Sequence, residues 1–284
     1  MAERQDHAFR MAKPPRDVVK AAQNRFRETH AKAFENWAEY RRHKRVVEEE
    51  VNARVFGREP FSEAVRASLE ELRKSAASRA PVIRDGQFSG PPVFHVGPGL
   101  NIIGPPYDIG LVVALGSNAP SVQTSVASGV FGVVATASSG RNTYGSAGLA
   151  LFIVPSDPAR TLSIRPYYQY DYTWSCESHG PPTAHSYGQV SADVSGHSGS
   201  SSHDFPGNSE TLWSGSSDYW DDGSGAESDM FRIPDSELIV SGSEYYTVSY
   251  VCQASGDSNK NGFGWSVSYI RLHCRVPFIV VEEF

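Results

Sequence analysis

The chain has 284 residues, a net charge of −6 and a hydrophobic content of 39%, so it is long enough for one large or two ordinary domains with a packed core. Its charge is unevenly divided, because residues 1–80 hold 18 Lys/Arg and 13 Asp/Glu, whereas residues 81–284 hold 8 and 19. The sequence has no window of about 18 apolar residues and therefore excludes a transmembrane helix.

Residues 1–16 are predicted to form a flexible N-terminal tail. They contain neither the apolar core nor the small-residue cleavage site of a secretory signal. Acidic residues interrupt the basic ones, which argues against a transit peptide. We therefore expect the protein to be cytoplasmic as synthesised, with non-classical export or incorporation into an extracellular assembly as alternatives.

A long amphipathic helix is predicted over residues 17–55, which contain no Pro and no Gly. Pro14 and Pro15 block an earlier start, and Asp17 suits the positive end of the helix dipole. A helix of this length would span about 58 Å. Its apolar positions recur at helical spacing, and we expect them to form an assembly surface made of Val19, Phe26, Trp37, Tyr40, Val47 and Val51.

A second helix is predicted over residues 62–77, after the helix breakers Gly57 and Pro60 and the capping residue Ser62. The two helices would form a helical hairpin within an arm that covers residues 17–79. The excess length of the first helix favours self-assembly into a homo-oligomer, or docking to a protein partner. The alternative is that both helices simply cover the β domain.

A basic cluster lies within the first helix, at residues 41–45, and three glutamates follow it at residues 48–50. This alternation is typical of a solvated, ion-paired helix face. Nucleic acid is therefore an unlikely partner by sequence.

The pattern changes after a Pro/Gly-rich linker at residues 80–106, and residues 107–284 are predicted to form an antiparallel β-sandwich or jelly-roll-like domain. The fold class is thus mixed and mainly β. Eight strands are expected between turn signals, at residues 110–115, 129–137, 148–155, 161–174, 188–194, 238–241, 245–254 and 264–281.

Three cysteines, Cys176, Cys252 and Cys274, are too few and too scattered for a disulfide scaffold. The segment 255–264 is predicted to be a hairpin turn. That register would place Cys252 opposite residue 267 and away from Cys274, so reduced thiols are expected.

A Ser/Gly-rich loop is predicted over residues 195–229, with large aromatic residues inside it. Such rings are either anchors packed back onto the domain or an exposed binding surface. Aromatic rings next to carboxylates suit sugar binding, so the candidate ligand-binding residues are Tyr167, Trp213, Asp218, Tyr219, Trp220 and Asp221.

The same loop carries a candidate site for calcium or another hard cation, formed by Asp218, Asp222, Glu227 and Asp229. The ordinary solvated acidic loop is the alternative, and no other cofactor is expected. Two evenly spaced histidine pairs near Cys176 and Asp204 raise a weaker transition-metal alternative, made of His179, His185, His197 and His203.

No catalytic motif is present: the sequence lacks the G-x-S-x-G elbow, the P-loop and a dinucleotide fingerprint after a strand. We therefore predict a non-enzymatic structural or interaction protein, in which the helices mediate self-assembly or docking and the acidic β domain presents a binding surface. The alternatives are a lectin-like carbohydrate-binding module, a toxin or effector exported without a signal peptide, and a hydrolase.

Overall fold

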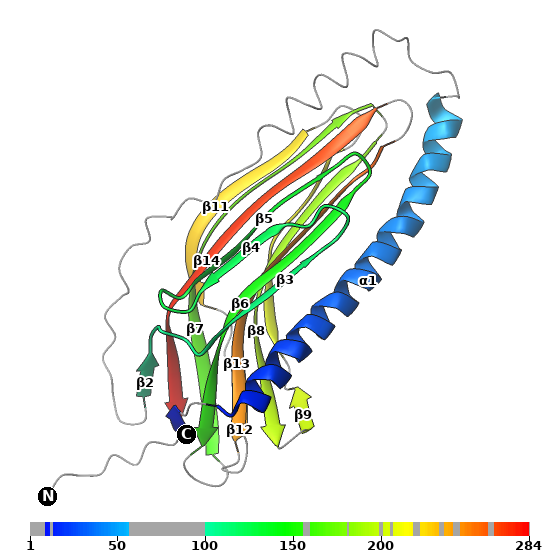
Figure 1. Cartoon of the computed structure of the whole chain (residues 1–284). Coiled ribbons are helices and arrows are strands. Elements are labelled where there is room, and N and C mark those ends of the chain that lie inside the picture. The colour runs from blue at the N-terminus through cyan, green and yellow to red at the C-terminus, as the bar shows by residue number, and fades with distance from the viewer. Residues whose placement is uncertain are drawn as a thin grey trace, which may run out of the picture.

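The fold is mainly β, with one helix at the N-terminus (Figure 1). The computed structural model describes residues 9–11, 14–56, 100–155, 160–180, 182–198, 201–204, 207–217, 222–232, 236–240, 245–260 and 264–283. The helix, α1 (Arg16–Phe56), agrees with the predicted first helix to within one residue at each end. The predicted second helix at 62–77, and with it the helical hairpin, lies outside the described residues.

The strands form two antiparallel sheets of seven strands each. Sheet A has the strand order β1-β6-β13-β8-β10. In addition, β3 pairs with β6 and β9 pairs with β8. Its strands are β1 (Phe9–Met11), β3 (Ile109–Leu115), β6 (Asn142–Pro155), β8 (Ala184–Ser198), β9 (Ser201–Asp204), β10 (Asn208–Ser217) and β13 (Tyr245–Ser258).

Sheet B has the strand order β11-β7-β14-β5-β4. In addition, β12 pairs with β7 and β2 pairs with β14. Its strands are β2 (Leu100–Ile103), β4 (Ser121–Ser125), β5 (Val130–Ser138), β7 (Arg160–His179), β11 (Asp222–Arg232), β12 (Ser236–Val240) and β14 (Trp265–Glu283). Each of the eight predicted strands overlaps one of these fourteen, so the mainly antiparallel β prediction is confirmed.

The two sheets face each other across a shared core, as expected of a sandwich-like fold. Alternate residues of the long strands point inward, and large aromatic side chains fill the space between the sheets. Tyr168 of β7 and Tyr250 of β13 meet edge to face with ring centroids 6.1 Å apart, and both are fully buried. The Tyr168 hydroxyl donates a hydrogen bond to the Ser191 carbonyl, which satisfies this buried polar group.

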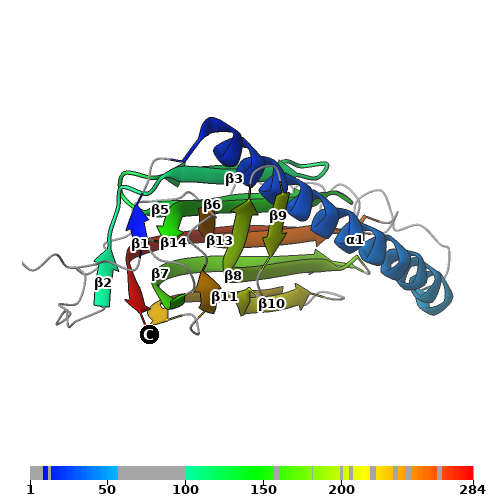
Figure 2. The same ribbon diagram turned by 90° about the horizontal axis from the view of Figure 1, so that it is seen from below.

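Helix α1 lies against the outer face of sheet A (Figures 1 and 2). Residues four apart on one helix face, Val18, Ala22 and Phe26, are buried there. They pack on apolar residues of β3, β6 and β13 that include Leu111, Phe152 and Val251. The C-terminal end of the helix extends past the ends of the strands (Figure 2).

Two short strands correct the predictions for the tail and the linker. β1 pairs with β6 in the segment predicted to be a flexible tail, with Phe9 opposite Pro155. β2 pairs with β14 inside the predicted linker, with Ile103 opposite Ile279. Both strands are short and pair at the edge of a sheet through backbone hydrogen bonds. The amino-acid composition of a segment does not reveal such bonds.

The predicted hairpin at 255–264 is wrong, because β13 and β14 belong to different sheets. β13 inserts between β6 and β8, and β14 inserts between β5 and β7. Polar and apolar residues alternate in the same way whether two consecutive strands pair with each other or lie in facing sheets. The turn residues between them therefore predicted a hairpin where the chain crosses from one sheet to the other.

The predicted Ser/Gly-rich loop at 195–229 is also wrong, because the segment forms β9, β10, most of β11 and the end of β8. The glycines leave room for large rings: a Cβ at Gly215 would lie 2.1 Å from the Trp174 ring, and one at Gly188 would lie 2.0 Å from the Trp213 ring. Small residues in these strands therefore complement tryptophans on their neighbours.

We expect Phe26→Ala to lower the free energy of unfolding by about 3 kcal/mol, because it removes a buried ring from the contact between α1 and sheet A. Tyr40→Ala on the same helix is the control, since Tyr40 is 63% exposed and its loss should change stability by less than about 0.5 kcal/mol. Urea unfolding measures both, and equal effects would contradict the docked helix.

Candidate functional site

The aromatic ligand-binding candidates do not gather on one surface. Trp213 is 6% exposed, its ring stacks on Tyr172 at 4.6 Å, and its indole N–H donates to the Ser186 hydroxyl. It is therefore an anchor in the core rather than a surface ring. Tyr167 lies in the other sheet, half-buried against Phe278. The remaining candidates, Asp218, Tyr219, Trp220 and Asp221, lie outside the described residues.

The acidic residues predicted to hold calcium are placed on a strand and not on a wrapping loop. Asp222, Glu227 and Asp229 all belong to β11, which pairs with β7 along its length. Positions 222 and 227 are an odd number of residues apart and so point to opposite faces. The Glu227 carboxylate accepts a hydrogen bond from the Tyr172 hydroxyl. Because Asp218 is outside the described residues, the calcium site stays a prediction.

The fold places the first histidine pair in different sheets and keeps the second pair on two paired strands, β8 and β9. His179 lies in sheet B, where it packs on Trp265 with ring centroids 4.5 Å apart, whereas His185 and His197 lie in sheet A. Within the described part of the chain, no group of three or more His, Cys, Asp or Glu side chains is arranged to hold a metal ion.

The predicted assembly stripe is divided between two environments. Val19 and Phe26 pack within the chain against sheet A, and Trp37 is half-buried beside Phe34. Tyr40 is exposed. The side chains of Val47 and Val51 are outside the described set. The N-terminal part of the stripe therefore covers the β domain, which is the simpler of the two sequence-based alternatives.

Buried polar contacts hold the middle of α1 on the sheet. His30 Nδ1 lies 2.6 Å from the Tyr144 hydroxyl, and His30 Nε2 lies 3.4 Å from the Ser146 hydroxyl. A neutral imidazole has one donor and one acceptor nitrogen, and both meet a hydroxyl here. Burial lowers the pKa of His30 from 6.5 to about 4, so the ring is neutral when the helix is docked.

An ion pair fixes α1 further along. The Arg41 guanidinium donates to the Asp257 carboxylate of β13 at 2.8 Å, and both side chains are more than nine-tenths buried. Burial, with the nearby charges of Arg41 and Lys44, lowers the pKa of His185 to about 3. Protonation of His30 or His185 is therefore disfavoured while the helix is docked.

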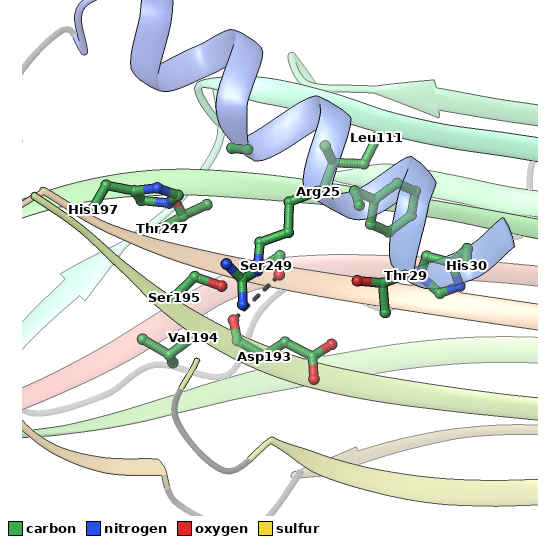
Figure 3. Close-up of a pocket in the computed structure, with 12 residues that line it drawn as sticks. Arg25, Thr29, His30, Leu111, Asp193, Val194, Ser195, His197, Thr247 and Ser249 are labelled. Atoms are coloured by element: carbon green, nitrogen blue, oxygen red, sulfur yellow. Dashed lines mark hydrogen bonds between the residues drawn. The ribbon is translucent and has the colours of Figure 1, made fainter. Parts of the chain in front are cut away.

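On the N-terminal side of these contacts, α1 and sheet A form a partly open cavity of about 210 Å³ (Figure 3). Its lining comes from α1, β3, β8 and β13. Part of the lining is apolar, with Ala22, Phe26 and Leu111. The rest is rich in hydroxyl and charged groups: Arg25, Thr29, His30, Asp193, Ser195, His197, Thr247 and Ser249.

The polar part of the lining is held in place by one hydrogen bond between β13 and β8 and one within β8. The Ser249 hydroxyl donates to the Asp193 carbonyl at 3.2 Å, and the Asp193 carboxylate accepts from Ser191 at 3.0 Å. Figure 3 shows Arg25 reaching from α1 toward Ser195 and Ser249. The cavity thus presents donors and acceptors that do not need to reorganise.

One contact in the wall has the spacing of a nucleophile and its base. The Thr247 hydroxyl lies 2.7 Å from His197 Nε2. Thr247 is 5% exposed and His197 is 3% exposed. The pair therefore joins two strands and does not present a hydroxyl at the surface.

Sequence reasoning missed this site, because none of its polar residues forms a motif. One signal was present: in β8, polar residues alternate with apolar or small ones from Gln189 to His197. Such alternation shows which strand face carries polar groups, but it does not show that α1 covers part of that face.

No protein-family model and no curated protein matches the chain. Among solved structures, the chain is similar to the carbohydrate-binding module TmCBM61 in complex with β-1,4-galactotriose. Identity is 9%, the match covers 64% of this chain and 86% of TmCBM61, and the TM-score is 0.17. A TM-score this low does not establish a shared fold or ligand. No helix in the described residues is long and apolar enough to cross a membrane.

We expect stability to fall on acidification, because the pKa of His30 is lower in the docked state than the 6.5 of an unfolded chain. The unfolded chain then takes up the proton first, and this contribution is complete above pH 6.5 and lost as the pH falls toward 4. Between pH 7 and pH 5, His30 alone should account for about 2 kcal/mol of the loss.

The measurement is urea unfolding at both pH values. His30→Gln should remove this part of the pH dependence, whereas His43→Gln, at an 80% exposed position of the same helix, should leave it intact. An unchanged pH dependence in His30→Gln would refute the buried neutral imidazole.

Proposed function

We propose that this chain is a non-enzymatic binding module of jelly-roll architecture, which holds a sugar in the cavity between α1 and sheet A. The strand orders support a jelly roll. β13 and β14, the last two strands, each insert into the middle of one sheet, giving β6-β13-β8-β10 and β5-β14-β7-β11. Two four-stranded sheets connected in this way are typical of that fold.

The observation that carries the ligand class is the mixed apolar and hydroxyl-rich lining of the cavity. Sugars have apolar C–H faces and a rim of hydroxyls, each both donor and acceptor. Phe26 and Leu111 offer apolar surface, and the same lining includes the hydroxyl side chains Thr29 of α1, Ser195 of β8 and Ser249 of β13. The volume of about 210 Å³ is below the roughly 300–1,000 Å³ of drug-sized sites, which suits one sugar ring.

Binding without catalysis fits the chemistry of the wall. His30 is held neutral and fully engaged by Tyr144 and Ser146, so it is not poised to exchange a proton near neutral pH. The Thr247 hydroxyl is committed to His197. These groups position the strands, and the remaining hydroxyls are suited to ligand contacts.

Ligand-observed NMR with a panel of neutral monosaccharides and disaccharides tests the proposal. At least one sugar should bind the wild-type chain. Thr29→Trp, which fills the cavity from an exposed position on α1, should weaken that binding at least about tenfold. Lys32→Trp is the matched control, because Lys32 is exposed on the same helix outside the cavity lining. No binding by any sugar, or equal binding by Thr29→Trp, would overturn the proposal.

A second candidate function is contact with a protein partner or another copy through the C-terminal half of α1. Tyr40 and Val46 favour it, since they are 63% and 59% exposed and are among the few large apolar side chains exposed in the described part of the chain. Tyr40 belongs to the predicted assembly stripe, whereas Val46 does not.

Light scattering of the full chain tests this candidate. If the surface mediates self-association, Tyr40→Ser with Val46→Ser should convert the assembly to a monomer, and the exposed polar pair Lys32→Ser with Asn36→Ser should not. A monomeric wild-type chain would exclude self-association at this surface.

A further inference from the structure

A chain of hydrogen bonds starts at the cavity and crosses the outer face of sheet A. His30 lines the cavity, and its Nδ1 lies 2.6 Å from the Tyr144 hydroxyl of β6. That hydroxyl donates to the Gln253 side-chain oxygen of β13 at 3.3 Å, and the Gln253 amide donates to the Gln189 side-chain oxygen of β8 at 3.4 Å. Side chains on three adjacent strands are therefore held in one polar network.

The network ends at an accessible patch, which consists of Tyr187, Gln189 and Thr211. The Tyr187 hydroxyl donates to the Gln189 side-chain oxygen at 2.5 Å and lies 3.2 Å from the Thr211 hydroxyl of β10. Thr211 is exposed, and the other two side chains are half-buried. The strand order β6-β13-β8-β10 and a spacing of about 4.8 Å between strands give a crossing of about 14 Å.

The patch and the cavity share one face of β8. Gln189 and Asp193 are four residues apart, so they point to the same side of the sheet, about 13 Å from each other along the strand. Asp193 lines the cavity. Ser191 lies between them, half-buried, and its hydroxyl donates to the Asp193 carboxylate at 3.0 Å. The polar surface is therefore continuous over a length greater than one sugar ring.

The directions of the hydrogen bonds determine what the patch offers to a ligand. Because the Tyr187 hydroxyl donates to Gln189, its oxygen accepts from Thr211. The contacts of Gln189 with Tyr187 and Gln253 use only its carbonyl oxygen, so its amide N–H groups can donate elsewhere. The Tyr187 ring is held by its hydroxyl and supplies a flat apolar surface between these polar groups.

We infer that Tyr187, Gln189 and Thr211 form a second sugar subsite, so that the ligand is a neutral oligosaccharide that extends from the cavity along β8 to β10. This inference rests on the proposed function, because the first ring occupies the cavity. In the second subsite another ring stacks on Tyr187, and its hydroxyls bind the Gln189 amide and the Thr211 hydroxyl. The network orders these side chains before the ligand arrives, which lowers the cost of binding.

Isothermal titration calorimetry of the full chain tests the inference with β-1,4-linked gluco-, manno- and xylo-oligosaccharides, each as the disaccharide and the hexasaccharide. In at least one series the hexasaccharide should bind about tenfold or more tightly than the disaccharide, because only the longer chain reaches β10. Tyr187→Ala should remove this gain and leave the Kd of the disaccharide unchanged.

Thr211→Trp is a second variant, which covers the patch from an exposed position and does not depend on replacing a half-buried ring. It should also reduce the hexasaccharide affinity to that of the disaccharide. Ser224→Trp is the matched control, because Ser224 is exposed on β11, the strand that ends sheet B as β10 ends sheet A. This variant should keep the full gain.

The outcomes separate this inference from the proposed function. Equal affinities for the disaccharide and the hexasaccharide would overturn the second subsite and leave binding in the cavity intact. A gain that survives both Tyr187→Ala and Thr211→Trp would overturn it as well. No binding at either length would contradict the proposed function and this inference together.

Discussion

The packing of α1 on the outer face of sheet A is the contact on which the candidate site depends. That face is apolar toward β3 and β6, where Leu111 and Phe152 meet the helix, and polar toward β8. Burial of the apolar side draws the helix down through Phe26 and its neighbours. The polar side is left beside the helix, and the space between them becomes the cavity. Without α1, the same residues would form an open, solvated sheet face.

Burial of apolar surface alone does not fix the position of a helix along a sheet, because the hydrophobic effect is non-directional and depends only on the area buried. The polar contacts supply that direction here. His30 meets Tyr144 and Ser146, and Arg41 meets Asp257 about three turns later. A shift of α1 would leave these buried groups unpaired, at a cost that exceeds the net gain from any one hydrogen bond. The His30 contact also makes the docked helix sensitive to acid, because burial lowers the pKa of this imidazole.

The sequence predicted the helix and eight of the strands because their signals are local. Apolar residues recur about every 3.6 residues in the helix, and polar and apolar residues alternate in the strands. It failed where the structure is decided by distant partners. Strands β10 and β11 are rich in Ser and Gly, and their packing is explained by the ring of Trp174 on β7, which lies over Gly215 of β10 and over Gly223 and Gly225 of β11. The site was missed for the same reason, since its walls are more than 160 residues apart in the chain.

Chemical-shift mapping on the isotope-labelled chain tests the central claim most directly, because it reports ligand and location together. As a binding sugar is added, the account predicts that shifts concentrate in three segments, residues 22–30 of α1, 193–197 of β8 and 247–249 of β13. Shifts that avoid α1 and gather instead on sheet B, or no shifts for any sugar tested, would contradict it.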